Sequence, residues 1–354
     1  MLKKFDKISH YKIREFSQFI GSLVSCCPAL RYSWMYTKNF ERQKFEALLK
    51  NKNNYESIMK INLNKEDYFW WTSKISRGYN LIKDSVFELE IFSDASLSGW
   101  GAVSGSKKVS GLWKHSEKKH HINFLELQAA FFGLKCFAER LSNIDILLRI
   151  DNTTAVSYIN RMGGIRYEKL NSITREIWQW CEKRNIWIFA SYISSKDNFK
   201  ADYESRRLEP DIEFELSNFA FECIITNFGI PEIDLFATRS NTKCSRYVSW
   251  KQDPGSEAID AFTLNWKTYF FYAFSPFSLI LSVLKKIKDD KAEGIVVIPD
   301  WPTQPWYPVF HSLLVKEPVV FNPDKKLLMN CCREPHPLWK SLTLVAGRLS
   351  GKHL

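Results

Sequence analysis

The chain has few cysteines close together in sequence, and none with the spacing of a structural zinc site. Of its eight cysteines only Cys26-Cys27 and Cys331-Cys332 are neighbours, and zinc ligands are normally separated by at least two residues. No apolar run approaches the roughly 20 residues that cross a bilayer. The polar start, Met1 to Asp6, lacks the apolar core of a secretory signal. We therefore expect reduced thiols, no membrane span and an intracellular location, in the cytoplasm or the nucleus.

Positive charge is in excess. Lys and Arg number 50 against 39 Asp and Glu, which gives a formal net charge of +11. Such a balance favours a polyanionic partner such as nucleic acid. The hydrophobic fraction of 45% is enough for a sizeable core. A chain of 354 residues is too long for a single core, so we expect two or three domains.

A first candidate site residue, Asp94, follows an alternating apolar and polar run over residues 86–91. That alternation predicts a half-buried strand with Asp94 at its end. Small residues then permit a tight turn, and a strand pattern resumes at Trp100. The carboxylate at this position is suited to bind a metal ion, or to form the turn by bonding its own backbone.

Three further carboxylates follow in order. Glu126 lies at the start of a predicted helix, where it could instead form a capping box with Asn123. Asp151 follows a predicted strand over residues 144–150, where it could instead cap the next helix. Asp202 lies in the first turn of a later helix, where a helix-dipole contact and an i,i+4 pair with Arg206 could instead explain it.

The order of a strand-end Asp, a helix Glu, a strand-end Asp and a helix Asp is the pattern that a shared metal site requires. With these residues the chain resembles the RNase H family, most closely the RNase H segment of DIRS-type and related retrotransposon polyproteins. The matching motifs are Ser93-Asp94-Ala95-Ser96, Gly99-Trp100-Gly101, Leu125-Glu126-Leu127, Asp151-Asn152-Thr153-Thr154-Ala155, Asn198, Ala201-Asp202 and Ser205-Arg206.

The resemblance implies an α/β fold, an RNase H-like five-stranded mixed sheet with flanking helices. It also implies a site in which Asp94, Glu126, Asp151 and Asp202 hold two Mg²⁺ or Mn²⁺ ions and hydrolyse the RNA strand of RNA–DNA hybrids. Oxygen-only ligands suit these ions better than zinc. Candidate nucleic-acid contacts are Ser96, Asn152, Arg161, Arg166, Lys169 and Arg175.

The chain departs from the family in the loop before Asp202. Family members often carry a histidine there, whereas this chain has Tyr192-Ile193-Ser194-Ser195. The resemblance therefore leaves open a slow enzyme, or an inactive module that serves nucleic-acid binding or assembly in a retrotransposon polyprotein.

The remaining sequence predicts flanking domains. Residues 1–82 read as a helical segment that resembles the thumb or connection of reverse transcriptases, and residues 83–208 as the RNase H-like domain. Residues 209–230 read as a linker and helix, residues 231–330 as a small α/β domain and residues 331–354 as a C-terminal tail. The polymerase palm is absent, so we expect no reverse transcription by this chain, although the polymerase part of a reverse transcriptase is a possible partner.

The α/β domain over residues 231–330 resembles the methyltransferase-like tail of DIRS-type elements. The motif Phe274-Ser275-Pro276-Phe277 keeps a proline and an aromatic residue. It lacks the amide or carboxylate that adenine methyltransferases use to hold the amino group that they methylate. No glycine-rich cofactor loop follows the strand at Ile233. We therefore expect this domain to be inactive, with adenine methylation as the less favoured alternative.

Overall fold

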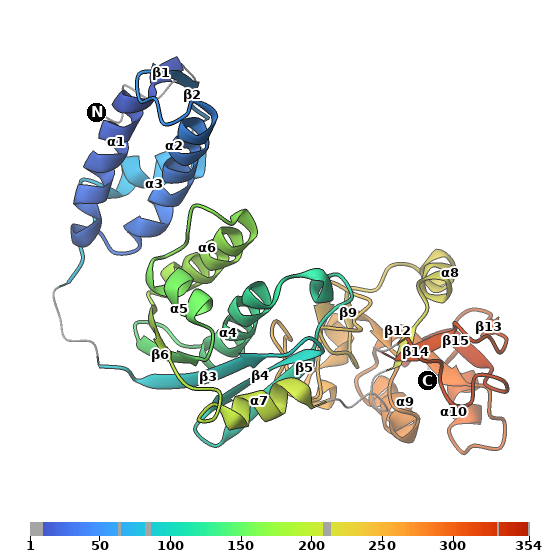
Figure 1. The fold of residues 1–354 in the computed structure, drawn as a ribbon. Helices are drawn as coiled ribbons and strands as arrows, with labels where there is room; N and C mark the ends of the chain where they lie inside the picture. The colour runs from blue at the N-terminus through green and yellow to red at the C-terminus, as the bar shows by residue number, and fades with distance from the viewer. Residues whose placement is uncertain (1–9, 63–64, 82–85, 208–213, 331–332, 353–354) are drawn as a thin grey trace. The chain divides into compact units, whose positions relative to one another are not determined.

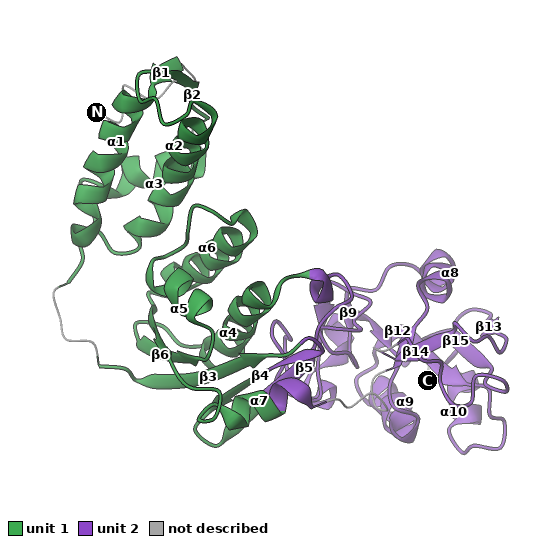
Figure 2. Ribbon diagram, viewed as in Figure 1, with its two compact units in different colours: residues 1–96, 101–108, 120–203 green, residues 97–100, 109–119, 204–354 purple. Residues whose placement is uncertain are grey.

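The computed structural model describes residues 10–62, 65–81, 86–207, 214–330 and 333–352. These residues divide into two compact units, which Figure 2 colours separately. Unit 1 takes in Met1–Ser96, Gly101–Lys108 and His120–Tyr203, and unit 2 takes in the remainder. The predicted boundaries at residues 82–83 and 208–209 lie outside the described residues.

Unit 1 begins with a helical segment, as the apolar periodicity predicts. It holds β1 (His10–Lys12), α1 (Ile13–Cys26), α2 (Lys38–Lys50), β2 (Ile58–Lys60) and α3 (Lys65–Lys74). The buried stripe of α1 includes Phe16 and Phe19, whose rings lie 6.3 and 5.8 Å from the ring of Phe40 on α2. Aromatic packing therefore joins these two helices.

The chain after this segment forms the expected mixed sheet over residues 89–192 (Figure 1). Its strands are β3 (Leu89–Ala95), β4 (Gly99–Ser104), β5 (Lys107–Leu112), β6 (Asp145–Ile150) and β7 (Trp187–Tyr192), in the spatial order β5-β4-β3-β6-β7. β6 runs parallel to both β3 and β7. The short connections between β3, β4 and β5 can join only antiparallel neighbours. The predicted five-stranded mixed sheet is confirmed.

Helices cover this sheet in the predicted succession. They are α4 (Ile122–Ala138), α5 (Thr153–Asn160), α6 (Glu168–Glu182) and α7 (Phe199–Arg206). Helix α4 lies close on the sheet at Gly133, where an added Cβ would come within 3.1 Å of side chains of Ala102 and Ile91. Since α4 contacts β3 along its length and carries Glu126 near its start, this packing brings Glu126 toward the end of β3.

Unit 2 is built around a six-stranded sheet with the order β10-β9-β11-β12-β15-β13. The strands are β9 (Ile233–Asp234), β10 (Arg246–Tyr247), β11 (Phe270–Ala273), β12 (Glu293–Pro299), β13 (Val319–Phe321) and β15 (Leu344–Ser350). A separate pair joins β8 (Phe214–Leu216) to β14 (Leu328–Asn330). The helices are α8 (Asn218–Phe228), α9 (Ile280–Asp289) and α10 (Tyr307–Leu313).

The predicted C-terminal tail is wrong, because β15 pairs along its whole length with β12 and also with β13. Alternate residues of β12 enter two different cores. Ile295 and Val297 pack on the α8 side, whereas Val296 and Ile298 pack on the α9 side. A strand buried on both faces carries a continuous apolar run, and this strand needs β15 as a neighbour for its backbone.

Among the described residues, we find no helix with the length and apolar character needed to span a membrane.

Candidate active site

The site is formed where two parallel strands end side by side. β3 and β6 pair in register, with Ser93 opposite Ile150, so the next residue of each chain segment, Asp94 and Asp151, lies at the same edge of the sheet. Asp94 is the penultimate residue of β3 and is buried, and Asp151 follows β6 and is half-buried. Strand geometry therefore brings together two carboxylates that are 57 residues apart in the sequence.

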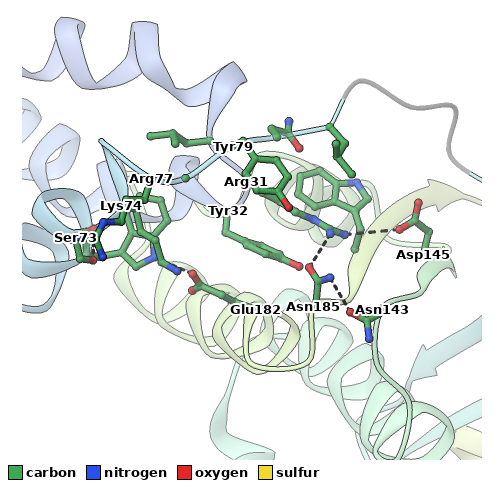
Figure 3. Close-up of a pocket in the computed structure, with 16 residues that line it drawn as sticks. Arg31, Tyr32, Ser73, Lys74, Arg77, Tyr79, Asn143, Asp145, Glu182 and Asn185 are labelled. Carbon is green, nitrogen blue, oxygen red and sulfur yellow. Dashed lines mark hydrogen bonds and ion pairs between the residues drawn. The ribbon is translucent and has the colours of Figure 1, made fainter.

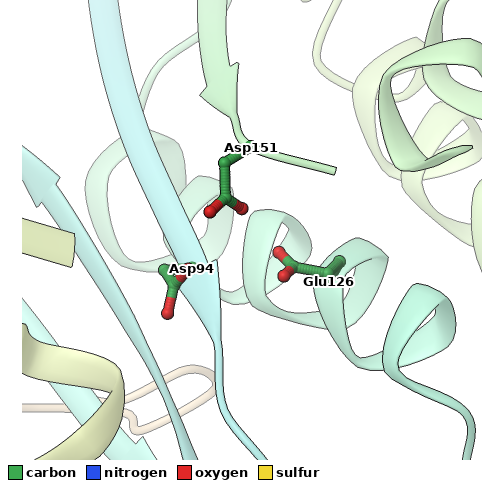
Figure 4. Close-up of side chains that lie close together, drawn as sticks. All are labelled: Asp94, Glu126 and Asp151. Atoms are coloured by element: carbon green, nitrogen blue, oxygen red, sulfur yellow. The ribbon is translucent and has the colours of Figure 1, made fainter. Parts of the chain in front are cut away.

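Helix α4 supplies a third carboxylate. One oxygen from each of Asp94, Glu126 and Asp151 lies within 4.8 Å of the other two, and Figure 4 shows the three side chains converging. Glu126 is 4% exposed. These three residues, hereafter the carboxylate cluster, form a compact set of oxygen ligands.

Burial and mutual repulsion perturb the cluster. Burial, the charge of Asp94 and then the charge of Asp151 raise the pKa of Glu126 to about 9 from its ordinary 4.5, against a hydrogen bond from the backbone of Ala95. Glu126 Oε2 has no hydrogen-bond partner among the described residues. Ionising a carboxyl group that is buried beside two other carboxylates costs free energy unless a cation neutralises the charge; otherwise the group stays protonated. The donor set thus fits Mg²⁺ or Mn²⁺, which prefer carboxylate oxygens.

Hydrogen bonds from other segments hold the two strand ends. Ser195 Oγ donates to Asp151 Oδ2 at 2.7 Å, and Asn198 Nδ2 donates to the carbonyl of Ser93 at 3.0 Å in a buried position. The sequence predicts neither contact, although Asn198 belongs to the motifs that resemble RNase H and Ser195 lies in the loop where that family often has histidine. The only advance signal was this family resemblance.

Asp202 is not part of the carboxylate cluster. It lies in the first turn of α7, as predicted, and is half-buried. Its backbone N–H donates to the carbonyl of Asn198 at 3.0 Å. Its role as a metal ligand stays a prediction.

Two of the structural alternatives for these carboxylates are wrong. The N-cap of α4 is His121, whose Nδ1 accepts a hydrogen bond from the N–H of Asn123 at 3.1 Å, so Glu126 forms no capping box with Asn123. The N-cap of α5 is Asn152, whose side chain accepts from the N–H of Ala155 at 2.9 Å. Neither Glu126 nor Asp151 is therefore needed to cap a helix.

The candidate nucleic-acid contacts differ in their availability. Ser96 is buried and Asn152 is half-buried beside the cluster, with Asn152 Nδ2 also donating to Asn123 Oδ1 at 2.9 Å. Exposed side chains that remain available are Arg161, Arg166 and Lys169.

Arg175 requires a correction. Its guanidinium binds Asp67, which is fully buried, and Glu66 Oε2 at 3.1 Å. Its side chain is 14% exposed. The arginine therefore neutralises a buried aspartate of α3, which contradicts its assignment as a phosphate contact.

Unit 2 has a cavity of about 800 Å³ that includes Ser275, Pro276 and Phe277 from the loop after β11. Nearby Asp234 is buried, which raises its pKa to about 6, and it accepts backbone N–H bonds from Phe236 and Lys243. Asp234 therefore shapes its own loop. The methyltransferase-like relationship of this unit stays a prediction.

No protein-family model matches the chain. The enzymatic polyproteins of cauliflower mosaic virus strains D/H and Strasbourg are each 30% identical over 134 residues, which cover 34% of this chain and 19% of the polyprotein. The chain thus spans about a fifth of the length of these curated relatives.

Two solved structures are similar over part of the chain. RNase H1 from the halophilic archaeon Halobacterium salinarum NRC-1 has 18% identity and a TM-score of 0.28, covering 33% of this chain and 92% of the archaeal one. The foamy viral protease-reverse transcriptase, in complex with RNA/DNA hybrid, has 12% identity and a TM-score of 0.21, covering 54% of this chain and 26% of the viral one. The DIRS-type relationship stays a prediction.

Proposed function

We propose that this chain is an RNase H-type endoribonuclease that uses two divalent ions, Mg²⁺ or Mn²⁺, to hydrolyse the RNA strand of RNA–DNA hybrids. The observation that carries the proposal is the carboxylate cluster, in which Asp94, Glu126 and Asp151 converge with oxygens within 4.8 Å of one another. They are three of the four carboxylates in the motifs that resemble RNase H.

Asp94, Glu126 and Asp151 would hold the ions together with Asp202, as the family resemblance implies. Divalent ions held by these carboxylates would supply a water ligand of lowered pKa and would stabilise the leaving oxygen of a phosphodiester. Without cations the close carboxylates repel one another, at a cost on the order of 3 to 4 kcal/mol per pair at an effective dielectric near 20. Charge balance therefore makes metal binding favourable.

The chain's own groups would position the hybrid. The amide of Asn152 directly follows Asp151 in sequence and would hydrogen-bond ribose hydroxyls, which distinguish RNA from DNA; the resemblance assigns the same role to the buried Ser96, two residues after Asp94. The exposed Arg161, Arg166 and Lys169 can contact backbone phosphates. Such contacts select a strand by its sugar and hold it by its charge.

The test is cleavage of a labelled RNA–DNA hybrid by the full chain with Mg²⁺, with Mn²⁺ and with EDTA. We expect cleavage of the RNA strand only with a metal ion, and loss of at least about a hundredfold in rate for Asp94→Asn, because the cluster then loses an ionised ligand. The control is Asp289→Asn, which removes the same charge from an exposed position on α9.

Equal rates for the wild type and Asp94→Asn would refute the proposal. Hybrid binding without cleavage would favour the alternative, an inactive binding or assembly module of a retrotransposon polyprotein.

A further inference from the structure

Unit 1 contains a cleft of about 790 Å³ that lies away from the carboxylate cluster (Figure 3). Its walls come from the helical segment and from the ends of β6 and β7 that are remote from Asp151. Asp145, the first residue of β6, lines it. Asp151 lies six positions after Asp145, which at about 3.3 Å per residue places the cleft about 20 Å from the cluster.

Hydrogen bonds build one wall of this cleft. Arg31 Nη1 donates to Asn185 Oδ1 at 2.7 Å, and Asn185 Nδ2 donates to Asn143 Oδ1 at 2.9 Å. Arg31 also lies 3.7 Å from the buried carboxylate of Asp145. Figure 3 shows this chain of contacts opposite the side of the cleft that Lys74 and Ser73 form.

Close packing builds the other wall. The backbone N–H groups of Arg77 and Gly78 both donate to the carbonyl of Lys74, which turns the chain directly after α3. A Cβ at Gly78 would come within 2.7 Å of Leu30, so this turn fits tightly onto the helical segment. Asn80 Nδ2 then donates to the carbonyl of Pro28 at 3.1 Å. The turn therefore has a defined position.

Two cationic side chains on this wall, Lys74 and Arg77, form no ion pair with a described residue. Lys74 and Arg77 are exposed, and within the described ranges no carboxylate lies at ion-pair distance from either. The other charges of the cleft are already engaged. Glu182, for example, accepts hydrogen bonds from Tyr36 and Trp70. The lining thus offers two positive charges to a ligand.

Aromatic rings accompany these charges. Tyr79 is 72% exposed and lines the cleft together with Trp187, whose ring packs against the Arg31 guanidinium at 5.3 Å. Cations that follow a phosphate backbone, combined with rings on which bases stack, are the recurring features of proteins that bind single strands.

We propose that this cleft binds single-stranded nucleic acid, with phosphates on Lys74 and Arg77 and a base stacked on Tyr79. This binding is independent of the hydrolysis proposed for the carboxylate cluster, since the two sites share no residue.

The proposal can be tested with a fluorescently labelled oligothymidylate and the full chain in EDTA, by anisotropy at several salt concentrations. Binding without metal separates this site from the hydrolytic one, which is proposed to need divalent ions. Replacing both Lys74 and Arg77 by Ala is expected to make the slope of log K against log salt shallower by about 1.4, because each phosphate contact on a single strand contributes about 0.7.

Tyr79→Ala is expected to weaken binding at least about fivefold, the lower end of the range for loss of one stacked base, and Tyr79→Phe is expected to retain it. The charge-matched control replaces Lys285 and Lys288 of α9 by Ala; both are exposed. Equal weakening by the control and cleft variants, or no effect of Tyr79→Ala, would overturn the proposal. Equal displacement of the oligonucleotide by polyglutamate at matched charge would overturn the assignment to nucleic acid.

Discussion

The raised pKa of Glu126 predicts how the free energy of unfolding of the metal-free protein depends on pH. The pKa of this buried carboxyl group is raised to about 9, first by burial and then by Asp94 and Asp151. Folding therefore favours the protonated form. The stability that this proton supports is fully present below the unfolded pKa near 4.5 and is lost as the pH rises toward 9.

The magnitude follows from the difference between the assay pH and the unfolded pKa. At about pH 7.5 the folded state has lost on the order of 4 kcal/mol relative to acidic conditions, since each pH unit in this window is worth about 1.4 kcal/mol. Glu126→Gln keeps the size of the side chain and removes the charge. We expect this variant to be more stable than the wild type in EDTA by up to about 4 kcal/mol, which corresponds to a rise in Tm of up to roughly 8 to 16 °C.

The assay is thermal unfolding of both proteins in EDTA at about pH 5 and about pH 7.5, repeated with Mg²⁺. The difference in Tm is expected to be small at the lower pH and large at the higher one, because only the ionised form is penalised. Addition of Mg²⁺ is expected to stabilise the wild type more than the variant, since bound ligand stabilises the folded state that holds it. The exposed Glu176 of α6 provides the control variant, Glu176→Gln.

The reasoning is refuted if Glu126→Gln is no more stable than the wild type in EDTA at the higher pH. It is also refuted if Mg²⁺ raises the Tm of both proteins equally.

Three further predictions concern groups around the site and the helical segment. Ser195→Ala is expected to slow hybrid cleavage several-fold and to lower Tm by only about 2 to 4 °C, because it removes about 1 kcal/mol of hydrogen bonding from the half-buried aspartate of the cluster; rates at saturating Mg²⁺ check this. Asn198→Ala is expected to destabilise unit 1 by about 1 to 3 kcal/mol in chemical denaturation, because it removes a buried hydrogen bond to the Ser93 carbonyl. Arg175→Ala is expected to cost about 3 to 5 kcal/mol, because Asp67 then remains buried without its cation, and adding Asp67→Asn is expected to restore part of that loss; no restoration would contradict this account of the pair.

Residue periodicity was sufficient to predict most secondary structure. The succession of strands and helices from β3 to α7 agrees with the prediction, because strands and amphipathic helices repeat their apolar residues with different periods. The segment at Leu344–Ser350 was missed. A strand that pairs with distant segments has only a weak local signal, since its stability comes from neighbours that the sequence does not identify.

Sequence by itself determined which carboxylates to consider, because Asp94, Glu126 and Asp151 each lie at an element terminus within a motif that resembles RNase H. Only the tertiary structure decided that these three converge, that Asp202 lies outside their cluster and that Arg175 pairs with Asp67. The physical reason is that element formation depends on neighbouring residues, whereas the distance between two side chains on different elements depends on strand register and helix packing. The raised pKa of Glu126 has the same origin, since burial and nearby charges exist only once the chain has folded.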